Sequence, residues 1–271
     1  MRVLVVGRQL DYQPVAMISQ AELKRLRALQ QKKFRAESGR FLVQGRKVVS
    51  ELLASTHGVE IILATEETAV FVREQAAQRK IPVQILAGHE LDKIGTFEKG
   101  NDLIAITVEP EEPAFRAPEA GELMLALDGI RDPRNLGSLV RIADWFGVKR
   151  ILLGNDCMEI YNPKVVSSTM GSLFRIEHRY VELSTELMQC AAEGAAIYVA
   201  DMGGTSVFEA KLARPSVLVL GSESHGHSEA VSALQASVIS IPRFGGAESL
   251  NVAMAAAALC TEFARQAIST G

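Results

Sequence analysis

Three segments in the C-terminal half of the chain combine glycine with amide, hydroxyl, guanidinium and carboxylate groups. They are LDGIRDPRNLGSLVRIADWFG from Leu127, VLVLGSESHGHS from Val217 and ISIPRFGGAESLNVAMA from Ile239. Each contains a short apolar run, which is typical of a buried strand in a parallel sheet. Open α/β sheets bind ligands beyond the carboxyl ends of such strands. We therefore expect one site to which three loops contribute.

The first segment carries an amide and a guanidinium on one predicted helix. Asn135 opens this helix and Arg141 follows it, so both can face a site at the N-terminal half of the helix. The other neighbours of Arg141 are apolar, so its charge needs a partner. An anionic ligand such as a phosphate is a suitable partner, and a salt bridge to Glu223 or Asp144 is the structural alternative. Asp132 and Asn135 are both candidates for the N-cap.

The second and third segments offer close backbone approach and polar side chains. Gly221 and Gly245 follow predicted strands, where backbone without a Cβ can approach a flat ligand such as adenine, or can simply turn. Ser249 and Asn251 begin the last predicted helix. We expect Ser249 to cap it, and Asn251, inside an apolar helix, to contact substrate or Glu223. The chain has neither a G-x-G-x-x-G fingerprint nor a P-loop.

Read together and in order, these segments resemble the three motifs of the SpoU/TrmH family of RNA ribose 2′-O-methyltransferases, in the SPOUT superfamily. The resemblance covers the chain from Glu122 to its end. It rests on positions that match the family pattern in type and spacing: Asn135, Arg141, Gly221, Glu223, Ile241, Pro242, Ser249, Leu250 and Asn251.

This resemblance implies an S-adenosyl-methionine-dependent enzyme that methylates a ribose 2′-hydroxyl in structured RNA. Ribosomal RNA is the favoured substrate, and a transfer-RNA methyltransferase of the same chemistry is an alternative. The catalytic domain would contain a deep trefoil knot near the C-terminus, although parallel sheets are normally unknotted. The enzyme would be a homodimer built through the knotted domain.

The resemblance also assigns roles to residues. Cofactor binding falls to the backbone at Gly221, Ile241 and Leu250. The catalytic site falls to Asn135, Arg141, Glu223, Ser249 and Asn251. A guanidinium has a pKa above about 12 and is a poor base, so we expect Arg141 to orient the hydroxyl and the adjoining phosphate. We expect Glu223 to hold Asn135 or Arg141 in place.

Several positions depart from the family pattern. Ser224 stands where the family has glycine, His225 and His227 flank Gly226, and Arg243 stands where methionine is usual. These changes would alter the rim of the cofactor pocket. They motivate a third interpretation, an RNA-binding protein of the same fold that has lost catalysis.

The elements that position these residues form two α/β regions, in which predicted strands alternate with helices. We expect an N-terminal extension at residues 1–16, a smaller α/β domain at 17–108 and a Pro-rich, acidic linker at 109–121. Residues 122–271 would form the catalytic domain, with a parallel sheet covered by helices on both faces. Its predicted helices span residues 136–146, 164–170, 182–192, 229–235 and 249–266.

In the first domain, Ser19 with Glu22 predicts a helix start, and Gly39 predicts a turn before a strand. The following helix should bury the side chains of Val48, Val49, Leu52 and Leu53. The segment FRAESGRFLVQG resembles an L30e-like substrate-binding domain, with Gln44 where the family has Glu.

Basic residues outnumber acidic ones between positions 17 and 50, which fits either an RNA-binding patch or a solvated helix face. The L30e-like resemblance favours RNA. The candidate RNA-binding residues are Arg35, Arg40, Arg46 and Lys47.

Composition sets outer limits on these interpretations. The chain has 271 residues, a net charge of −3 and 48% hydrophobic residues, so its total charge gives no sign of nucleic-acid binding. Cys157, Cys190 and Cys260 are scattered, which predicts neither a disulfide framework nor a zinc site. We expect no metal, no membrane span and no signal peptide, and therefore a cytoplasmic protein.

Overall fold

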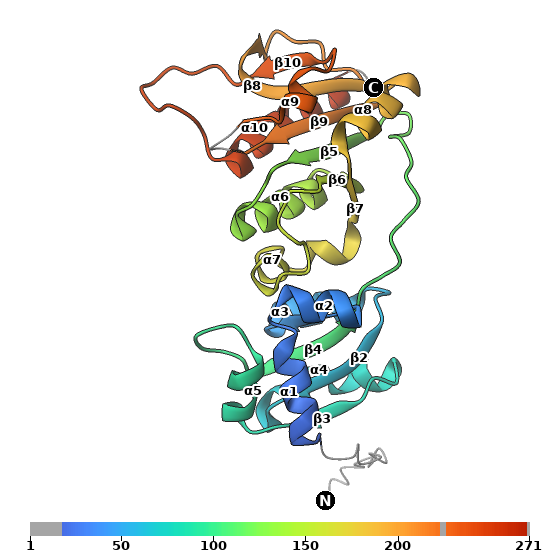
Figure 1. The fold of residues 1–271 in the computed structure, drawn as a ribbon, viewed down its shortest axis with the longest axis vertical. Coiled ribbons are helices and arrows are strands. Elements are labelled where there is room, and N and C mark those ends of the chain that lie inside the picture. The colour runs from blue at the N-terminus through green and yellow to red at the C-terminus, as the bar shows by residue number, and fades with distance from the viewer. Residues whose placement is uncertain (1–17, 223–225, 270–271) are drawn as a thin grey trace, which may run out of the picture.

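The computed structural model describes residues 18–222 and 226–269. The expected extension at residues 1–16 lies outside the described residues, as do Glu223, Ser224 and His225. Figure 1 shows two units stacked along the long axis of the molecule, connected by a segment that runs along the outside. No helix among the described residues is long and apolar enough to cross a membrane.

The first unit contains a four-stranded sheet. Its elements are α1 (Gln20–Ala28), α2 (Lys32–Ser38), β1 (Arg40–Gln44), α3 (Arg46–Ala54), β2 (Val59–Ala64), α4 (Glu66–Gln78), β3 (Val83–Ile85), α5 (Gly88–Ile94) and β4 (Leu103–Val108). The strand order is β1-β4-β2-β3. Strand β4 is antiparallel to β1 and β2, and β3 is parallel to β2.

The local predictions for this unit are confirmed. Ser19 Oγ accepts a hydrogen bond from the backbone N–H of Glu22 at 3.2 Å, which caps α1. Gly39 ends α2 with a φ of 61°, in the left-handed region that favours glycine. The predicted apolar face of α3 is buried against the sheet.

The second unit contains a six-stranded sheet. Its elements are β5 (Leu123–Asp128), α6 (Pro133–Trp145), β6 (Arg150–Gly154), α7 (Pro163–Ser168), the 3-10 helix Ser172–Arg175, β7 (Glu177–Val181), α8 (Leu183–Ala192), β8 (Ala196–Ser206), β9 (Ser216–Gly221), α9 (Glu229–Ser232), β10 (Ser237–Ser240) and α10 (Val252–Ser269). The strand order is β10-β8-β9-β5-β6-β7, and every adjacent pair is parallel.

The predicted parallel sheet with helices on both faces is confirmed. Leu125 and Leu127 of β5 pack into the core that contains residues of α6 and α10, whereas Met124 and Ala126 pack into the core that contains residues of α8. This alternation is the period of two expected for a strand buried on both faces. One strand, β7, was not predicted, because its sequence EHRYV is polar and lies at the edge of the sheet.

The two units share a continuous hydrophobic core and a buried ion pair. The ring of Phe41 stacks on Tyr161 with a centroid distance of 4.3 Å. Arg35 is only 1% exposed, and its Nε donates to Oε1 of Glu159 at 2.7 Å, with Nη2 on the second carboxylate oxygen. The prediction that Arg35 contacts RNA is therefore wrong. This guanidinium fastens α2 to the second unit.

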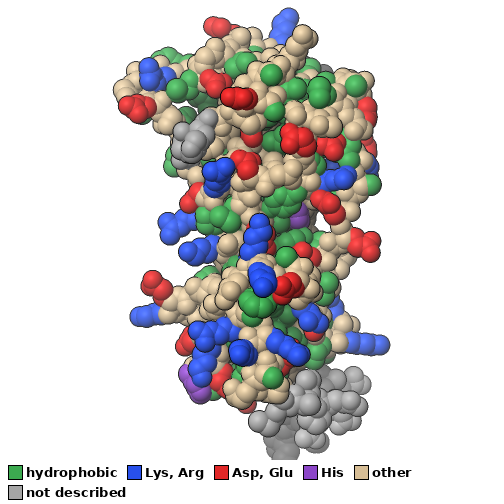
Figure 2. Space-filling model, viewed as in Figure 1, with side chains coloured by type: hydrophobic (Ala, Val, Ile, Leu, Met, Phe, Trp, Pro, Cys, Tyr) green, Lys and Arg blue, Asp and Glu red, His purple; other side chains and the backbone are tan. Residues whose placement is uncertain are grey.

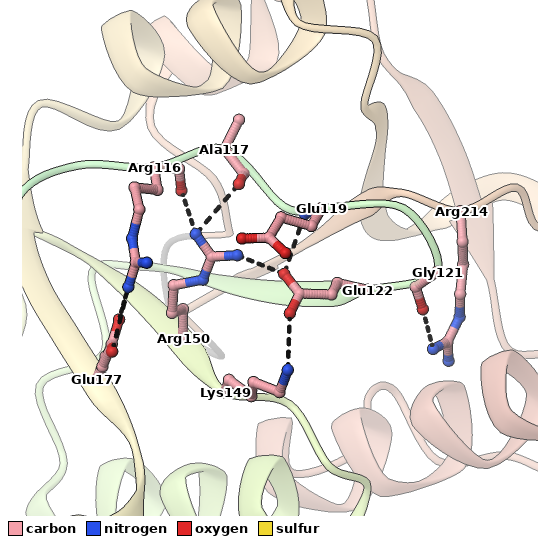
Figure 3. Close-up of polar contacts among 9 residues, drawn as sticks. All are labelled: Arg116, Ala117, Glu119, Gly121, Glu122, Lys149, Arg150, Glu177 and Arg214. Atoms are coloured by element: carbon pink, nitrogen blue, oxygen red, sulfur yellow. Dashed lines mark hydrogen bonds and ion pairs between the residues drawn. The ribbon is translucent and has the colours of Figure 1, made fainter.

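The connecting segment is held to the second unit at Arg150 and Glu122 (Figure 3). Arg150 Nη1 donates to the carbonyl oxygen of Ala117 at 3.1 Å, and its Nη2 pairs with Glu122. Lys149 Nζ and the backbone N–H of Glu119 also donate to Glu122, at 3.1 and 3.0 Å. The segment thus has fixed anchor points although it contains no helix or strand.

The Glu122 carboxylate predicts a pH-dependent contribution to stability. Burial raises its pKa, but the donors from Glu119, Lys149 and Arg150 outweigh burial and lower the pKa to about 2. The folded-state pKa lies below the ordinary value of 4.5, so the stabilisation is present above pH 4.5 and is lost as the pH falls through about 2. Glu122→Gln should therefore lower the free energy of unfolding at pH 7, by an amount that shrinks with acidification.

The measurement is urea denaturation of both proteins between pH 7 and pH 2. Glu177→Gln is the control, because Glu177 forms an exposed pair with Arg116 and should contribute little at any pH. A Glu122→Gln deficit that stays constant down to pH 2 would contradict the assigned carboxylate contacts.

Candidate active site at the carboxyl edge of the parallel sheet

The three polar segments meet at one edge of the six-stranded sheet. They follow β5, β9 and β10, and Asp128 at the end of β5 lies opposite Gly221 at the end of β9. A cavity of about 620 Å³ opens there. Its lining includes Ala200, Gly221, His227, Ile241, Ser249 and Leu250. The three residues predicted to bind the cofactor therefore line one cavity, whose volume suits a small ligand.

The first and third segments are joined through two asparagine side chains. Asn251 Nδ2 donates to Oδ1 of Asn135 at 2.9 Å. The same side chain uses Oδ1 to accept from the backbone N–H groups of Ala253 and Met254, at 3.0 and 3.3 Å. These bonds satisfy donors at the start of α10. One side chain thus fixes the start of a helix and a contact between two motifs.

This geometry corrects the predicted start of the last helix. Helix α10 begins at Val252, not at Ser249. Asn251 therefore precedes the helix and provides its side-chain cap, where we had expected Ser249 to cap it and Asn251 to lie inside it. Ser249 lies in the preceding loop and lines the cavity.

At the start of α6, Asp132 is the N-cap. Its Oδ1 accepts from the backbone N–H groups of Arg134 and Asn135, at 2.8 and 2.9 Å. Pro133 occupies the first turn, where its missing N–H costs nothing. Because Asp132 caps the helix, the Asn135 side chain is left to bond Asn251.

Arg141 lies on the outer face of α6. The buried residues of this helix are Leu136, Gly137, Leu139, Val140 and Ala143. Our premise that apolar neighbours would bury the Arg141 side chain is wrong, because the residue is exposed. Among the described residues it forms no hydrogen bond or ion pair, so the alternative salt bridge to Asp144 is not formed. The Asp144 carboxylate is bound by Arg175 instead.

Gly221 sits where no side chain fits. A Cβ there would lie 2.8 Å from the carbonyl oxygen of Gly226 and 2.9 Å from Cε1 of His227. The second loop itself therefore requires this glycine. A Cβ at Gly245 would meet no atom within 4 Å, so no close approach requires glycine at that position. Arg243 is exposed and donates to the carbonyl of Ala247 in its own loop, at 3.3 Å.

His227 ties the second segment to β8. Its side chain is only 4% exposed, and Nε2 lies 2.8 Å from the carbonyl oxygen of Ala200. A carbonyl can only accept, so Nε2 is the donor. Nδ1 lies 3.8 Å from Oδ2 of Asp128, which accepts from the backbone N–H of Ser228 at 2.7 Å. The sequence marked His227 only as a departure from a pattern and gave no signal of this contact.

The remaining predicted RNA-binding residues lie on the first unit, where Lys and Arg side chains gather (Figure 2). Each is partly exposed and has an acidic partner. Arg40 pairs with Glu60, Lys47 with Glu51, and Arg46 with both Glu67 and Asp102. The Arg46 guanidinium also lies 4.6 Å above the ring of Phe71. These cations are separate from the cavity.

In residues 18–222 and 226–269, no group of three or more His, Cys, Asp or Glu side chains is arranged to hold a metal ion. The three cysteines are buried free thiols. Burial raises the pKa of the Cys157 thiol to about 11.

Comparison with known proteins matches both units. The SpoU rRNA Methylase family model matches residues 122–261, and the MRM3-like substrate binding domain matches residues 20–105. The chain is 30% identical to the 23S rRNA (guanosine(2553)-2′-O)-methyltransferase RlmP of Bacillus subtilis, over 88% of this chain and 94% of that protein. It is 31% identical to the 23S rRNA (uridine(2479)-2′-O)-methyltransferase of Streptomyces viridochromogenes, over 87% and 86%.

Solved structures share the whole architecture. The SpoU methyltransferase AviRb from Streptomyces viridochromogenes, solved in complex with the cofactor AdoMet, superposes with a TM-score of 0.84. The two chains are 28% identical, and the match covers 93% of this chain and 99% of the other.

Two adjacent glycines in β8, Gly203 and Gly204, should differ in how much a substitution by alanine lowers the free energy of unfolding. A Cβ at Gly204 would lie 2.5 Å from the carbonyl carbon of Val238 and 2.6 Å from the backbone nitrogen of Ile239. These are backbone atoms of a paired strand and cannot move aside. We expect Gly204→Ala to destabilise the fold by about 1–3 kcal/mol. A Cβ at Gly203 meets only Asp201 Oδ1, at 3.9 Å, so Gly203→Ala is the matched control.

Thermal and urea unfolding of the two variants checks this prediction. Gly203→Ala should change the free energy of unfolding by less than about 0.5 kcal/mol. Equal stabilities for the two variants would show that β8 and β10 do not pack as closely as described.

Proposed function

The chain belongs to the SpoU rRNA Methylase family of S-adenosyl-methionine-dependent RNA 2′-O-methyltransferases, and we propose that it methylates a ribose 2′-hydroxyl of 23S ribosomal RNA. The named relatives that match both units act on 23S rRNA, which favours ribosomal over transfer RNA. A substrate of this kind agrees with the cytoplasmic location expected from the sequence.

The cavity at the sheet edge is our proposed cofactor site. Its volume of about 620 Å³ lies in the range of pockets that bury small ligands. Its lining includes the apolar residues Ile239 and Leu259 together with Gly221, Ile241 and Leu250. When bound, S-adenosyl-methionine supplies an electrophilic methyl group on a sulfonium. Apolar walls with backbone donors and acceptors suit an adenosine.

The exposed guanidinium of Arg141, for which the described part of the chain offers no partner, is the observation that carries the catalytic proposal. It projects from the helix whose first turn is bonded to Asn251 at the cavity. A guanidinium binds phosphate oxygens in a planar fork. We propose that Arg141 holds the phosphate next to the target ribose and orients its 2′-hydroxyl toward the cavity. Such positioning can supply a large part of the rate enhancement.

We propose two domains, residues 17–108 and 122–271, the second containing a trefoil knot. The first sheet ends at Val108 and the second begins at Leu123, which supports these boundaries. The match of the SpoU rRNA Methylase family model to residues 122–261 supports the knot.

The first domain is the proposed substrate-binding domain. Arg40, Arg46 and Lys47 are exposed and could exchange their acidic partners for RNA phosphates. The salt dependence of RNA binding would give the number of these side chains that bind phosphates. Each neutralised phosphate steepens the fall of the logarithm of the binding constant with the logarithm of the salt concentration. Phe71, 59% exposed beside Arg46, adds a ring on which a base could stack.

We propose a homodimer through the second domain. Large hydrophobic side chains are exposed on α6, on α10 and in the loop before α10. They are Trp145, Phe244, Leu250 and Met254. We propose that a partner subunit covers these side chains, as happens to exposed hydrophobic surface at protein interfaces.

The dimer proposal predicts the effect of one charge. Met254→Lys should convert the dimer to a monomer in sedimentation velocity, because a buried lysine at a dimer interface has no partner. Val70→Lys is the matched control, since Val70 on α4 is 68% exposed and Met254 is 67% exposed. A monomeric native protein, or an equal effect of both substitutions, would refute this interface.

The catalytic proposal predicts that Arg141→Ala keeps cofactor affinity but loses methyl transfer by about 100-fold or more. Affinity is measured by calorimetric titration with S-adenosyl-methionine, and transfer by mass spectrometry of a 23S rRNA transcript. The control is Arg73→Ala, which removes another exposed arginine that has no ion-pair partner among the described residues.

Three results would change the assignment. Full activity of Arg141→Ala would remove Arg141 from the site. Transfer to tRNA alone would replace the substrate. Cofactor binding without transfer to any RNA would favour the inactive RNA-binding alternative.

A further inference from the structure

Helix α6 carries a carboxylate one turn away from Arg141. Asp144 follows Arg141 by one helical turn, and residues at this spacing are neighbours on a helix surface, with Cβ atoms about 5–6 Å apart. The spacing therefore allows an ion pair between Arg141 and Asp144. It is absent, and among the described residues Arg141 has no partner of any kind.

Arg175 is the reason for this absence. Its Nε lies 3.1 and 3.0 Å from the two carboxylate oxygens of Asp144, and its Nη2 lies 2.7 Å from Oδ2. The guanidinium presents a planar fork to the carboxylate, which is the strongest geometry for this pair. Asp144 lies near the C-terminal end of α6, where the helix dipole disfavours a negative charge. A cation at this place stabilises the ionised carboxylate, and Arg175 provides it.

The position of Arg175 is itself fixed by the other domain. Its Nη1 donates to Oε2 of Glu51 on α3 at 2.6 Å, and Glu51 also pairs with Lys47. Burial raises the pKa of Asp144, but hydrogen bonds from Arg175 and Ser172 outweigh burial and lower it. Two carboxylates from two domains thus hold one guanidinium.

We propose that Arg175 is a positioning residue for methyl transfer, which binds Asp144 and thereby leaves the Arg141 guanidinium available to RNA. This inference rests on the proposed role of Arg141. Without Arg175, Asp144 would pair with Arg141, and RNA phosphate would have to displace a carboxylate on the same helix. The uncompensated negative charge would also repel the RNA backbone.

The test is a double-mutant cycle in the full-length protein. Arg175→Ala should lower kcat/KM for a 23S rRNA transcript about tenfold, the order expected for one charge a few ångströms away at a protein surface. The dissociation constant for S-adenosyl-methionine should not change. Adding Asp144→Asn should restore kcat/KM to within about twofold of the Asp144→Asn single variant, because the competing carboxylate is then absent.

A matched control separates this effect from the loss of any surface ion pair. Arg116→Ala removes an exposed arginine that donates to both carboxylate oxygens of Glu177, at 3.3 and 3.0 Å, and that lies in the connecting segment. It should leave kcat/KM unchanged. Glu51→Gln removes the ion pair between Arg175 and the first domain but leaves Arg175 bound to Asp144. It should therefore lower kcat/KM much less than Arg175→Ala.

Three outcomes would overturn the inference: an unchanged Arg175→Ala variant, a double variant as slow as Arg175→Ala, or a Glu51→Gln variant equal to Arg175→Ala. The last two would show that Arg175 acts by docking the domains. Fluorescence anisotropy of an RNA fragment, at several salt concentrations, gives a readout without turnover. If the native protein transfers no methyl group, the proposed function fails, but weakened RNA binding in Arg175→Ala that Asp144→Asn restores would still support this inference.

Discussion

The hydrogen bond between Asn251 and Asn135 is the contact on which the site depends. It links the starts of α10 and α6, the helices that begin within the third and first motifs. The same Asn251 side chain caps α10, so loss of this residue would free both a helix end and an inter-motif contact. Because Asp132 caps α6, Asn135 can use its amide for this bond. Arg141 lies on the same helix as Asn135, so this hydrogen bond also helps to place the Arg141 backbone.

The buried pair of Arg35 and Glu159 imposes a second constraint, on the two units. Removing either side chain would leave an uncompensated buried charge, which would strongly destabilise the fold. Together with the stack of Phe41 on Tyr161, it gives the units one shared core. If RNA binds the first unit as proposed, it lies at a fixed distance from the cavity. A rigid connection of this kind favours recognition of a ligand by its shape.

Periodicity and turn chemistry were enough to predict most elements, and the chemistry of three loops was enough to predict where they meet. Both depend on residues close together in sequence. The errors have a different origin. Arg35 is buried by Glu159, which lies 124 residues away, and no local pattern reveals such a partner. The start of α10 was misplaced because Ser249 and Asn251 are equally good caps on composition, and only the contact with Asn135 distinguishes them.

The same distinction explains why the motifs alone do not define the site. They supply the amides, the guanidinium and the glycines, but not the electrostatic state of those groups. The Asp144 carboxylate on the helix of Arg141 is bound by Arg175, and the His227 side chain bonds the carbonyl of Ala200. Arg175 lies outside every motif, and His227 departs from the pattern of the second one. Electrostatic availability is thus a property of the folded neighbourhood, and chains with identical motifs can differ in it.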